Sequence, residues 1–317
     1  MIVTVTPNPS VDWTLEVSEL VRGAVHRISG EHQEPSGKGV NVSRALTHNA
    51  VPTLAVVPVG GPEGAELETL LRGEGVLFVA VPIRGRVRVN ISVTEPDGFA
   101  TKINAAGPTL HDDEVHALLN AAASAGSGAD WVLGSGSLPR GVPADFYAQL
   151  GSAVRATGAR LALDSSGQAL VAGLAARPEV VKPNVEELAE AVGRSLPSIG
   201  DAVQAAEELR AQGARSVVVS LGRDGALLVD GEGALHAEAV VDDPKSTVGA
   251  GDALLAGYLA GRQRQNDDRF AALREAVAWG SGAVATPGSH VPVITDAHRR
   301  AVEITEDVQS ERPLSSP

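Results

Sequence analysis

Short continuous apolar runs alternate along the chain with longer segments whose apolar residues recur at helical spacing. Such runs indicate strands buried on both faces, and the amphipathic segments between them indicate helices that cover a parallel sheet. The predicted strands are Ile2–Thr6, Thr53–Val59, Trp131–Gly134, Arg160–Asp164, Val180–Lys182 and Ser216–Leu221. The predicted helices are Lys38–His48, Pro62–Arg72, Asp112–Ser124, Pro143–Ala156, Val185–Val192, Ile199–Ala211, Ala250–Arg262, Arg269–Ala283 and Thr295–Thr305. This order predicts an α/β fold built on a doubly wound, mainly parallel sheet.

Two stretches depart from this alternation of strands and helices. Asp12–Gln33 and Arg86–Asn104 show strand-like patterns with no helix between the runs. They predict a small separate sheet, placed as a lid beside the carboxyl ends of the core strands, where α/β folds bind ligands. We therefore expect a core of residues 1–308, interrupted by a β lid formed from about 11–35 and 86–106. The polar residues 309–317 are expected to form a disordered tail.

The net charge of −13 narrows the classes of partner. Nucleic-acid binding depends on cationic groups that neutralise phosphates, so nucleic acid is not an expected partner, and neither is an anionic membrane. A small anionic substrate is still compatible, because a few local cations can define a pocket. The chain has no cysteine, which excludes disulfides and thiolate metal sites. It starts as a strand and has no apolar stretch of membrane-spanning length, so we expect a cytoplasmic protein.

The segment Ser246–Ala253 carries the strongest candidate chemistry. Its glycines precede a predicted helix, so the free N–H groups of Gly249, Ala250 and Gly251 would point at an anion with the helix dipole behind them. Asp252, in the first turn, is placed to accept a proton from an attacking hydroxyl. The alternative is a plain glycine turn in which Asp252 serves as the helix N-cap.

Two more segments open predicted helices. In the first, Gly37, the ammonium of Lys38 and the amide of Asn41 suit the hydroxyls and phosphate of a sugar, although a loop without ligand would explain them as well. In the second, Asn184 and Glu187 lie three positions apart, and an amide oxygen with a carboxylate suits a hydrated Mg²⁺. A helix N-cap with a capping-box glutamate explains this second pair equally well.

Further candidates lie at a strand end and in the predicted lid. The segment Ser220–Gly225 suits the edge of a nucleotide, but it also suits a hairpin turn. Arg86, Arg88 and Asn90 share one strand face, and Arg84 adds to a cationic run that could equally be a solvated surface.

Isolated polar residues give weaker signals. Asp12 could bind sugar hydroxyls or be a surface carboxylate. His111 and His116 lie five positions apart, which is off-register for one helix face, and no other pair of histidines has the spacing of metal ligands.

The order of these motifs is informative. Thr6–Asp12, Gly37–Asn41, Lys182–Glu187 and Thr247–Asp252 together closely resemble the phosphofructokinase-B branch of the ribokinase-like sugar kinases. The resemblance runs from residue 1 to about 295. The chain departs from the family's pattern at Ser36, where glycine is usual, and at Lys102, a lid position that is often acidic or neutral.

The resemblance implies a ribokinase-like fold, ATP and Mg²⁺ as cofactors, and a lid that often serves as a homodimer interface. It implies Asp252 as catalytic base, with Gly249, Ala250 and Gly251 as the anion hole. The residues implied to contact ATP are Lys182, Asn184, Ser220, Gly222, Gly225, Thr247, Gly249 and Gly251. Those implied to contact a sugar phosphate are Asp12, Gly37, Lys38, Asn41, Arg88, Asn90 and Ser137. Asn184 and Glu187 are implied to support the metal.

The expected reaction is ATP-dependent phosphoryl transfer to a primary hydroxyl of a ketohexose phosphate. Fructose 1-phosphate, giving fructose 1,6-bisphosphate, is the expected substrate, and tagatose 6-phosphate and fructose 6-phosphate are alternatives with a similar outline. A sugar-phosphate-binding regulator without catalysis is an alternative of a different class, and the intact Asp252 speaks against it. A dinucleotide-dependent oxidoreductase is excluded, because the first strand ends in Pro7-Asn8-Pro9 and lacks the G-x-G-x-x-G turn.

Overall fold

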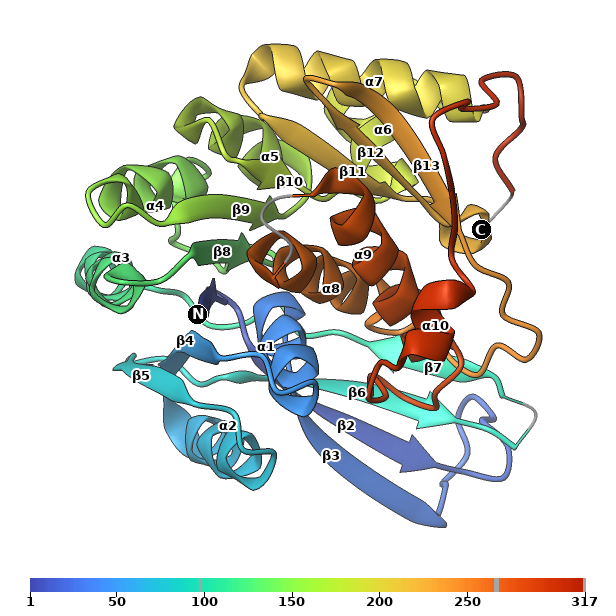
Figure 1. Cartoon of the computed structure of the whole chain (residues 1–317). Helices are drawn as coiled ribbons and strands as arrows, with labels where there is room; N and C mark the ends of the chain where they lie inside the picture. The colour runs from blue at the N-terminus through green and yellow to red at the C-terminus, as the bar shows by residue number, and fades with distance from the viewer. Residues whose placement is uncertain (97, 265–267, 316–317) are drawn as a thin grey trace.

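The computed structural model describes residues 1–96, 98–264 and 268–315. Its main sheet consists of β1 (Ile2–Val5), β4 (Thr53–Val59), β5 (Phe78–Pro82), β8 (Trp131–Ser135), β9 (Arg160–Asp164), β10 (Val180–Val181), β11 (Ser216–Ser220), β12 (Ala226–Asp230), β13 (Gly233–Glu238) and β14 (Glu303–Thr305). The spatial order is β14-β13-β12-β11-β10-β9-β8-β1-β4-β5 (Figure 1). Pairing is parallel from β5 to β11 and antiparallel among β11, β12, β13 and β14. The doubly wound, mainly parallel sheet is therefore confirmed.

Helices cover both faces of this sheet. They are α1 (Lys38–His48), α2 (Gly61–Gly73), α3 (Asp112–Gly126), α4 (Phe146–Arg155), α5 (Gly167–Gly173), α6 (Val185–Val192), α7 (Ile199–Gln212), α8 (Ala250–Arg264), α9 (Arg269–Val284) and α10 (Asp296–Arg300). Because side chains alternate along a strand, Val3 and Val5 of β1 join the core beneath α3 to α7, whereas Ile2 joins the core beneath α1, α8 and α9. The result is three layers, with α1, α8 and α9 in front of the sheet in Figure 1.

A small four-stranded sheet lies beside the main one, below α1 in Figure 1. Its strands are β2 (Ser10–Glu16), β3 (Gly30–Ser36), β6 (Arg88–Thr94) and β7 (Ala100–Ile103), in the order β3-β2-β6-β7. Two sequence excursions thus meet in space, because β2 pairs in parallel with β6 and places Asp12 opposite Asn90. The separate small sheet is confirmed.

Several elements differ from the prediction. The helix predicted over Thr295–Thr305 is wrong: α10 ends at Arg300, and Glu303–Thr305 forms β14 against β13. Two elements, β5 and α5, were not predicted. Helix α5 has only 7 residues, too few to establish a helical period, whereas β5 lies in the continuous apolar run of residues 76–82, which has the same pattern as the predicted strands and was overlooked.

The C-terminal segment, residues 309–315, is also ordered against the core, contrary to the expectation of a disordered tail for 309–317. The Ile199 N–H donates to the Arg312 carbonyl at 3.0 Å. The Ser315 N–H and the Arg312 guanidinium donate to the buried Asp224 carboxylate at 2.7 and 3.1 Å. The prediction is wrong for 309–315, while residues 316 and 317 lie outside the described chain.

In the described part of the chain, no helix is both long enough and apolar enough to span a membrane.

Candidate functional site

The carboxyl ends of the parallel strands bring the predicted site residues together. From β1 the chain first adds β4 and β5 on one side of β1 in the sheet, and it then returns to add β8 on the other side of β1. The order of the strands therefore reverses beside β1. Ligands bind doubly wound sheets at such a switch point. Asn8 follows β1, Ser137 follows β8, Asp164 ends β9, and Lys182 follows β10. Helices α1, α6 and α8 begin close to the same edge, where Lys38 binds Glu187 and Asn41 binds Asp252.

Helix α1 presents Lys38 to this edge. Gly37, at its N-cap, has φ of 119°, and a Cβ there would lie 2.9 Å from the Thr6 side chain, so glycine is required. The Lys38 ammonium donates to Asp164 and to Glu187, each at 2.8 Å. Burial opposes the charge on Lys38, but the carboxylates around it more than offset that effect and raise its pKa. Lys38 is therefore a permanently charged, partly exposed cation at the centre of the site.

Helix α8 begins at the predicted glycine turn. Gly249 has φ of 75° and precedes Ala250, the first residue of the helix. Asp252, only 8% exposed, accepts a hydrogen bond from the Asn41 amide at 2.8 Å. Burial, followed by the negative charge of Asp164, raises the pKa of Asp252 to about 6, although Lys38 and Asn41 act in the opposite direction. A carboxylate poised near neutral pH is suited to accept a proton.

Asp164, which no motif in the sequence marks, connects the two cationic groups of the site. It is fully buried, receives Lys38 through Oδ1, and lies 3.5 Å from the Lys182 ammonium through Oδ2. A Cβ at Gly251 would lie 3.5 Å from that same ammonium, so Lys182 also reaches the start of α8. One feature of the sequence could have identified Asp164 as a site residue: it is a carboxylate at the carboxyl end of the buried strand Arg160–Asp164.

Helix α6 begins with the predicted pair Asn184 and Glu187, and the two residues form a capping box. The Glu187 N–H donates to Asn184 Oδ1 at 2.7 Å, and the Asn184 N–H donates to Glu187 Oε2 at 2.9 Å. Glu187 Oε1 accepts from Lys38. The capping interpretation of this pair is thus confirmed, and it places the Glu187 carboxylate at the same edge as Lys38 and Asp164.

The small sheet contributes a polar face. Asp12 Oδ1 accepts hydrogen bonds from Ser10 at 2.7 Å and from the Asn90 amide at 2.9 Å. The Arg88 guanidinium donates to the carbonyls of Ala105 and Asn8, each at 3.0 Å, and so ties the small sheet to the loop after β1. Burial lowers the pKa of Arg88, and the charge of Asp12 partly offsets that effect.

The cationic run expected in this region is only partly present. Arg84 binds Asp113 at the start of α3, and Arg86 binds Glu63 in α2. Arg84 and Arg86 precede β6 in the chain, and each forms an ion pair with a carboxylate of a core helix. Their charges are therefore neutralised and do not add to that of Arg88. Lys102 lies in β7, a fully exposed strand, and faces solvent.

Unpartnered polar atoms gather around these residues. Among the described residues, the buried side-chain atoms without a hydrogen-bond partner include Thr6 Oγ1, Asn8 Oδ1, Asn41 Oδ1, Arg88 Nε, Ser135 Oγ and Asp164 Oδ2. Several of their residues are neighbours: the Asn8 carbonyl accepts from Arg88, and a Cβ at Gly39 would lie 2.5 Å from Thr6 Oγ1 and 3.5 Å from the Ser135 side chain. Buried polar groups are rarely left unpaired. Their concentration indicates that a polar ligand completes the site.

The residues expected to contact a nucleotide lie along the neighbouring edge. Ser220 forms an isolated bridge with Asn184, which places the end of β11 beside the start of α6. The turn Gly222–Asp224 follows, and Gly225 at φ 80° leaves no room for a Cβ, which would lie 2.0 Å from the Ala237 carbonyl. Thr247 is exposed ahead of the glycine turn of α8.

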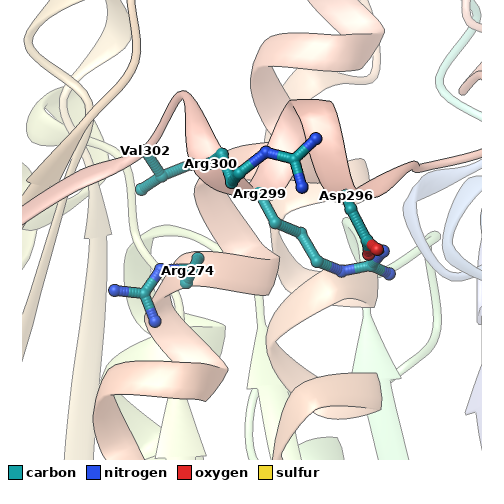
Figure 2. Close-up of a pocket in the computed structure, with 5 residues that line it drawn as sticks. All are labelled: Arg274, Asp296, Arg299, Arg300 and Val302. Atoms are coloured by element: carbon teal, nitrogen blue, oxygen red, sulfur yellow. The ribbon is translucent and has the colours of Figure 1, made fainter.

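A separate hollow of about 420 Å³ lies between α9 and α10, away from these residues. Figure 2 shows its lining, in which Arg299 reaches Asp296 while Arg274 and Val302 lie on the opposite side. The Arg299 guanidinium pairs with Asp296 and with Glu275, so that charge is already balanced. The hollow contains none of the predicted site residues.

Comparison with known proteins defines the class. A family model described as the pfkB family carbohydrate kinase matches residues 6–296. The structure of Arabidopsis thaliana ribokinase, complexed with ribose and ATP, has a TM-score of 0.72 at 21% identity over 95% of this chain and 96% of that one, a likeness of fold. This chain belongs to the pfkB family of carbohydrate kinases.

Similar relatives lie within one part of that family. The chain is 38% identical to a 1-phosphofructokinase of Bacillus subtilis, over 84% of this chain and 86% of that protein. It is also 38% identical to a 1-phosphofructokinase of Haloferax volcanii, over 96% and 98%. Phosphofructokinase-2 of Escherichia coli, in complex with potassium, superposes with a TM-score of 0.89 at 35% identity, over 95% and 97%.

Proposed function

We propose that this protein transfers a phosphoryl group from ATP to a primary hydroxyl of a ketohexose phosphate, with fructose 1-phosphate as its substrate. The observation that carries the proposal is the group of unpartnered buried polar atoms between the small sheet and the starts of α1 and α8. Hydroxyl, amide and carboxylate oxygens are present there together with the Arg88 Nε–H donor, and sugar hydroxyls can both donate to and accept from such a set. The 1-phosphofructokinases among the relatives support the choice of sugar.

Asp252 is the proposed base, and the start of α8 is the proposed anion hole. Asn41 fixes one carboxylate oxygen of Asp252, and the other is left to accept the proton of the sugar hydroxyl. The N–H groups of Gly249 and Gly251 would then stabilise the charge on the transferred group, and the Ala250 N–H, which donates to the Thr247 carbonyl at 3.3 Å, would join them only by leaving that carbonyl. Little covalent work falls to the protein in phosphoryl transfer, so positioning and electrostatic stabilisation account for the catalysis.

ATP and Mg²⁺ are proposed to bind along the edge formed by Lys182, Asn184, Ser220, Gly222, Gly225 and Thr247. Each oxygen of the Glu187 carboxylate has one hydrogen-bond partner, and a carboxylate oxygen can accept two. The donor set therefore fits a Mg²⁺ ion that Glu187 and Asn184 hold through water molecules. When bound, the ion would neutralise charge on the phosphates.

Asp12, Asn90 and Ser137 are proposed to bind sugar hydroxyls, and Lys38 and Arg88 the sugar's phosphate. Lys38 comes from the main core and Arg88 from the small sheet, so a phosphate held by both would bind only with that sheet closed over the site. In this proposal the small sheet is a lid. This agrees with the division predicted from the sequence, a core of residues 1–308 interrupted by a lid from about 11–35 and 86–106.

We also propose a homodimer formed through the lid. In register, Trp13, Ile91 and Ile103 share the face opposite to Asp12 and Asn90. Ile103 is 59% exposed, and an apolar face of this kind is suited to a second copy of the chain.

The decisive experiment measures kcat/KM with ATP and Mg²⁺ for fructose 1-phosphate, fructose 6-phosphate, tagatose 6-phosphate and free fructose. We expect fructose 1-phosphate to have the highest value. A higher value for either 6-phosphate would reassign the substrate within the same reaction. Binding of a sugar phosphate with no turnover would instead support the catalytically inactive regulator.

A further inference from the structure

We propose that His32, Glu34 and His290 form a binding site for a divalent transition-metal ion, of which Zn²⁺ is the type. His32 and Glu34 lie on β3 of the small sheet, and His290 lies in the loop between α9 and α10. The imidazole and carboxylate atoms of these three residues lie within 4.8 Å of one another. We call this group the His–Glu–His cluster.

The backbone places the three side chains together. His32 and Glu34 are two positions apart on a strand, so they point to the same face of the small sheet. Glu34 Oε2 lies 3.9 Å from His32 Nε2 and 4.0 Å from His290 Nε2. Three ligand atoms around one ion at about 2.0–2.2 Å would stand slightly closer than this. The imidazoles are 64% and 56% exposed, which leaves both free to turn inward.

Glu34 is held in the orientation that a ligand needs. Ser289 Oγ donates to Glu34 Oε1 at 2.7 Å, which leaves Oε2 facing both histidines. The buried Arg44 guanidinium also contacts Oε2, at 3.3 Å, but its Nε–H is bound to Glu74 at 2.6 Å, which balances the charge. Carboxylate ligands are commonly fixed by hydrogen bonds of this kind, which orient them before the metal arrives.

The composition of the cluster decides the class of ion. Two imidazoles and one carboxylate suit Zn²⁺, Co²⁺ or Ni²⁺, whereas Mg²⁺ and Ca²⁺ prefer oxygen ligands alone. Three protein ligands leave positions open for water, as in zinc sites that retain an exchangeable ligand. The cluster is thus distinct in chemistry from the proposed magnesium position at Glu187.

An ion at this place would connect two parts of the molecule that the proposed reaction uses. His32 belongs to the small sheet, while His290 follows Ser289, which packs against the glycine turn of α8: a Cβ at Gly249 would lie 3.6 Å from Ser289. The bound ion would therefore restrain the small sheet relative to the start of α8. This consequence rests on the proposed function, but the binding of metal does not.

The test is isothermal titration of the untagged protein with Zn²⁺, without nucleotide or sugar, together with the visible absorption of bound Co²⁺. We expect one ion per chain with a dissociation constant in the micromolar range. His32→Ala and His290→Ala should each weaken binding by at least about tenfold, and each should remove the Co²⁺ absorption. His116→Ala, an exposed histidine on α3, is the matched control and should leave both measurements unchanged.

Binding that the double variant His32→Ala/His290→Ala retains at full strength would overturn the proposal, because the ion would then sit on carboxylates elsewhere. The absence of binding up to millimolar Zn²⁺ would overturn it as well. Both histidines are exposed, so the variants should fold, and thermal unfolding without metal is the check. Because no substrate is present, failure of this test leaves the proposed kinase activity untouched, and failure of the kinase assay leaves this test untouched.

Discussion

Asp252 is a carboxylate on which opposing influences act. Its burial and its proximity to Asp164 favour the protonated form, whereas Lys38 and the Asn41 amide favour the ionised form. The first pair prevails and raises the pKa of Asp252 to about 6. A proposed base with this value is ionised at neutral pH and becomes protonated under mildly acidic conditions.

We therefore predict that kcat/KM falls as the pH drops through about 6, because protonated Asp252 can no longer accept the hydroxyl proton. Asp252→Asn removes the acceptor and keeps the shape, so it should lower kcat by about 10²- to 10⁴-fold with little effect on KM. The measurements are a pH–rate profile of the wild type and steady-state kinetics of the variant. A variant that keeps more than a tenth of the wild-type kcat would show that Asp252 is not the base; a cap role is already excluded, because α8 begins at Ala250 and Asp252 lies inside its first turn.

The residues of the site differ in how well the sequence predicts them. Lys38, Asn41 and Asp252 stand beside glycines at helix starts, where a local pattern marks them, and the structure brings the three together. Asp164 and Asn8 have no such mark. Asp164 comes next to Lys38, and Asn8 next to Arg88, only because the parallel strands end at the same edge of the sheet. The sequence alone does not show which strands are adjacent in that sheet.

At the scale of elements, the start of α6 is the place where two roles overlap. Glu187 closes the capping box with Asn184 and also binds Lys38. Glutamine serves in a capping box as well as glutamate does. A substitution that keeps the cap and removes the charge can therefore separate the structural role from the proposed support of the metal.

We predict that Glu187→Gln raises the Mg²⁺ concentration needed for half-maximal rate and destabilises the fold less than Glu187→Ala does, because glutamine keeps the cap of α6 although it loses the charge that faces Lys38. Glu187→Ala is the control that removes both functions, and it should also destabilise the fold by about 0.5–2 kcal/mol, as the loss of a helix cap does. Mg²⁺ titrations of the rate and thermal unfolding provide the two measurements. If Glu187→Gln leaves the Mg²⁺ requirement as it was, Glu187 serves the helix cap and the ion pair with Lys38 but not the metal.

Helices could be predicted from the sequence where a clear start signal was followed by a periodic apolar face. Lys38–His48 and Val185–Val192 agree with the structure at both ends, because a glycine or a capping residue starts each helix and a periodic apolar face extends it. The helix predicted over Thr295–Thr305 failed after Arg300. There β14 gains pairing to the edge strand β13 and packs Ile304 against the core, a long-range contact that outweighs local helix propensity.

At the scale of the whole molecule, Arg88 is one of the links between the small sheet and the core. Its guanidinium binds the Asn8 carbonyl of the core while its own backbone belongs to β6, and its Nε–H has no partner. A phosphate bound at this point would complete the hydrogen bonding of Arg88 and hold the two sheets together.

We predict that Arg88→Ala raises the KM for the sugar phosphate by about 10- to 150-fold, the equivalent of a lost charge-assisted hydrogen bond of about 1.5–3 kcal/mol. The KM for ATP should hardly change. Arg84→Ala is the matched control, since Arg84 is exposed and paired with Asp113, and it should leave both constants near their wild-type values. Equal effects of the two substitutions in steady-state kinetics would mean that Arg88 supplies only general positive potential.

The C-terminal segment determines when, during synthesis, the fold can be completed. Translation delivers β12 and the turn Gly222–Asp224 long before residues 309–315, yet Asp224 receives Arg312 and Ser315 as partners. Domains generally fold as units during synthesis, so a nascent chain carries this carboxylate without those partners until residues 312 and 315 have been added. A premature stop after residue 308 would leave every predicted site residue in place and still deprive the proposed nucleotide edge of its final support.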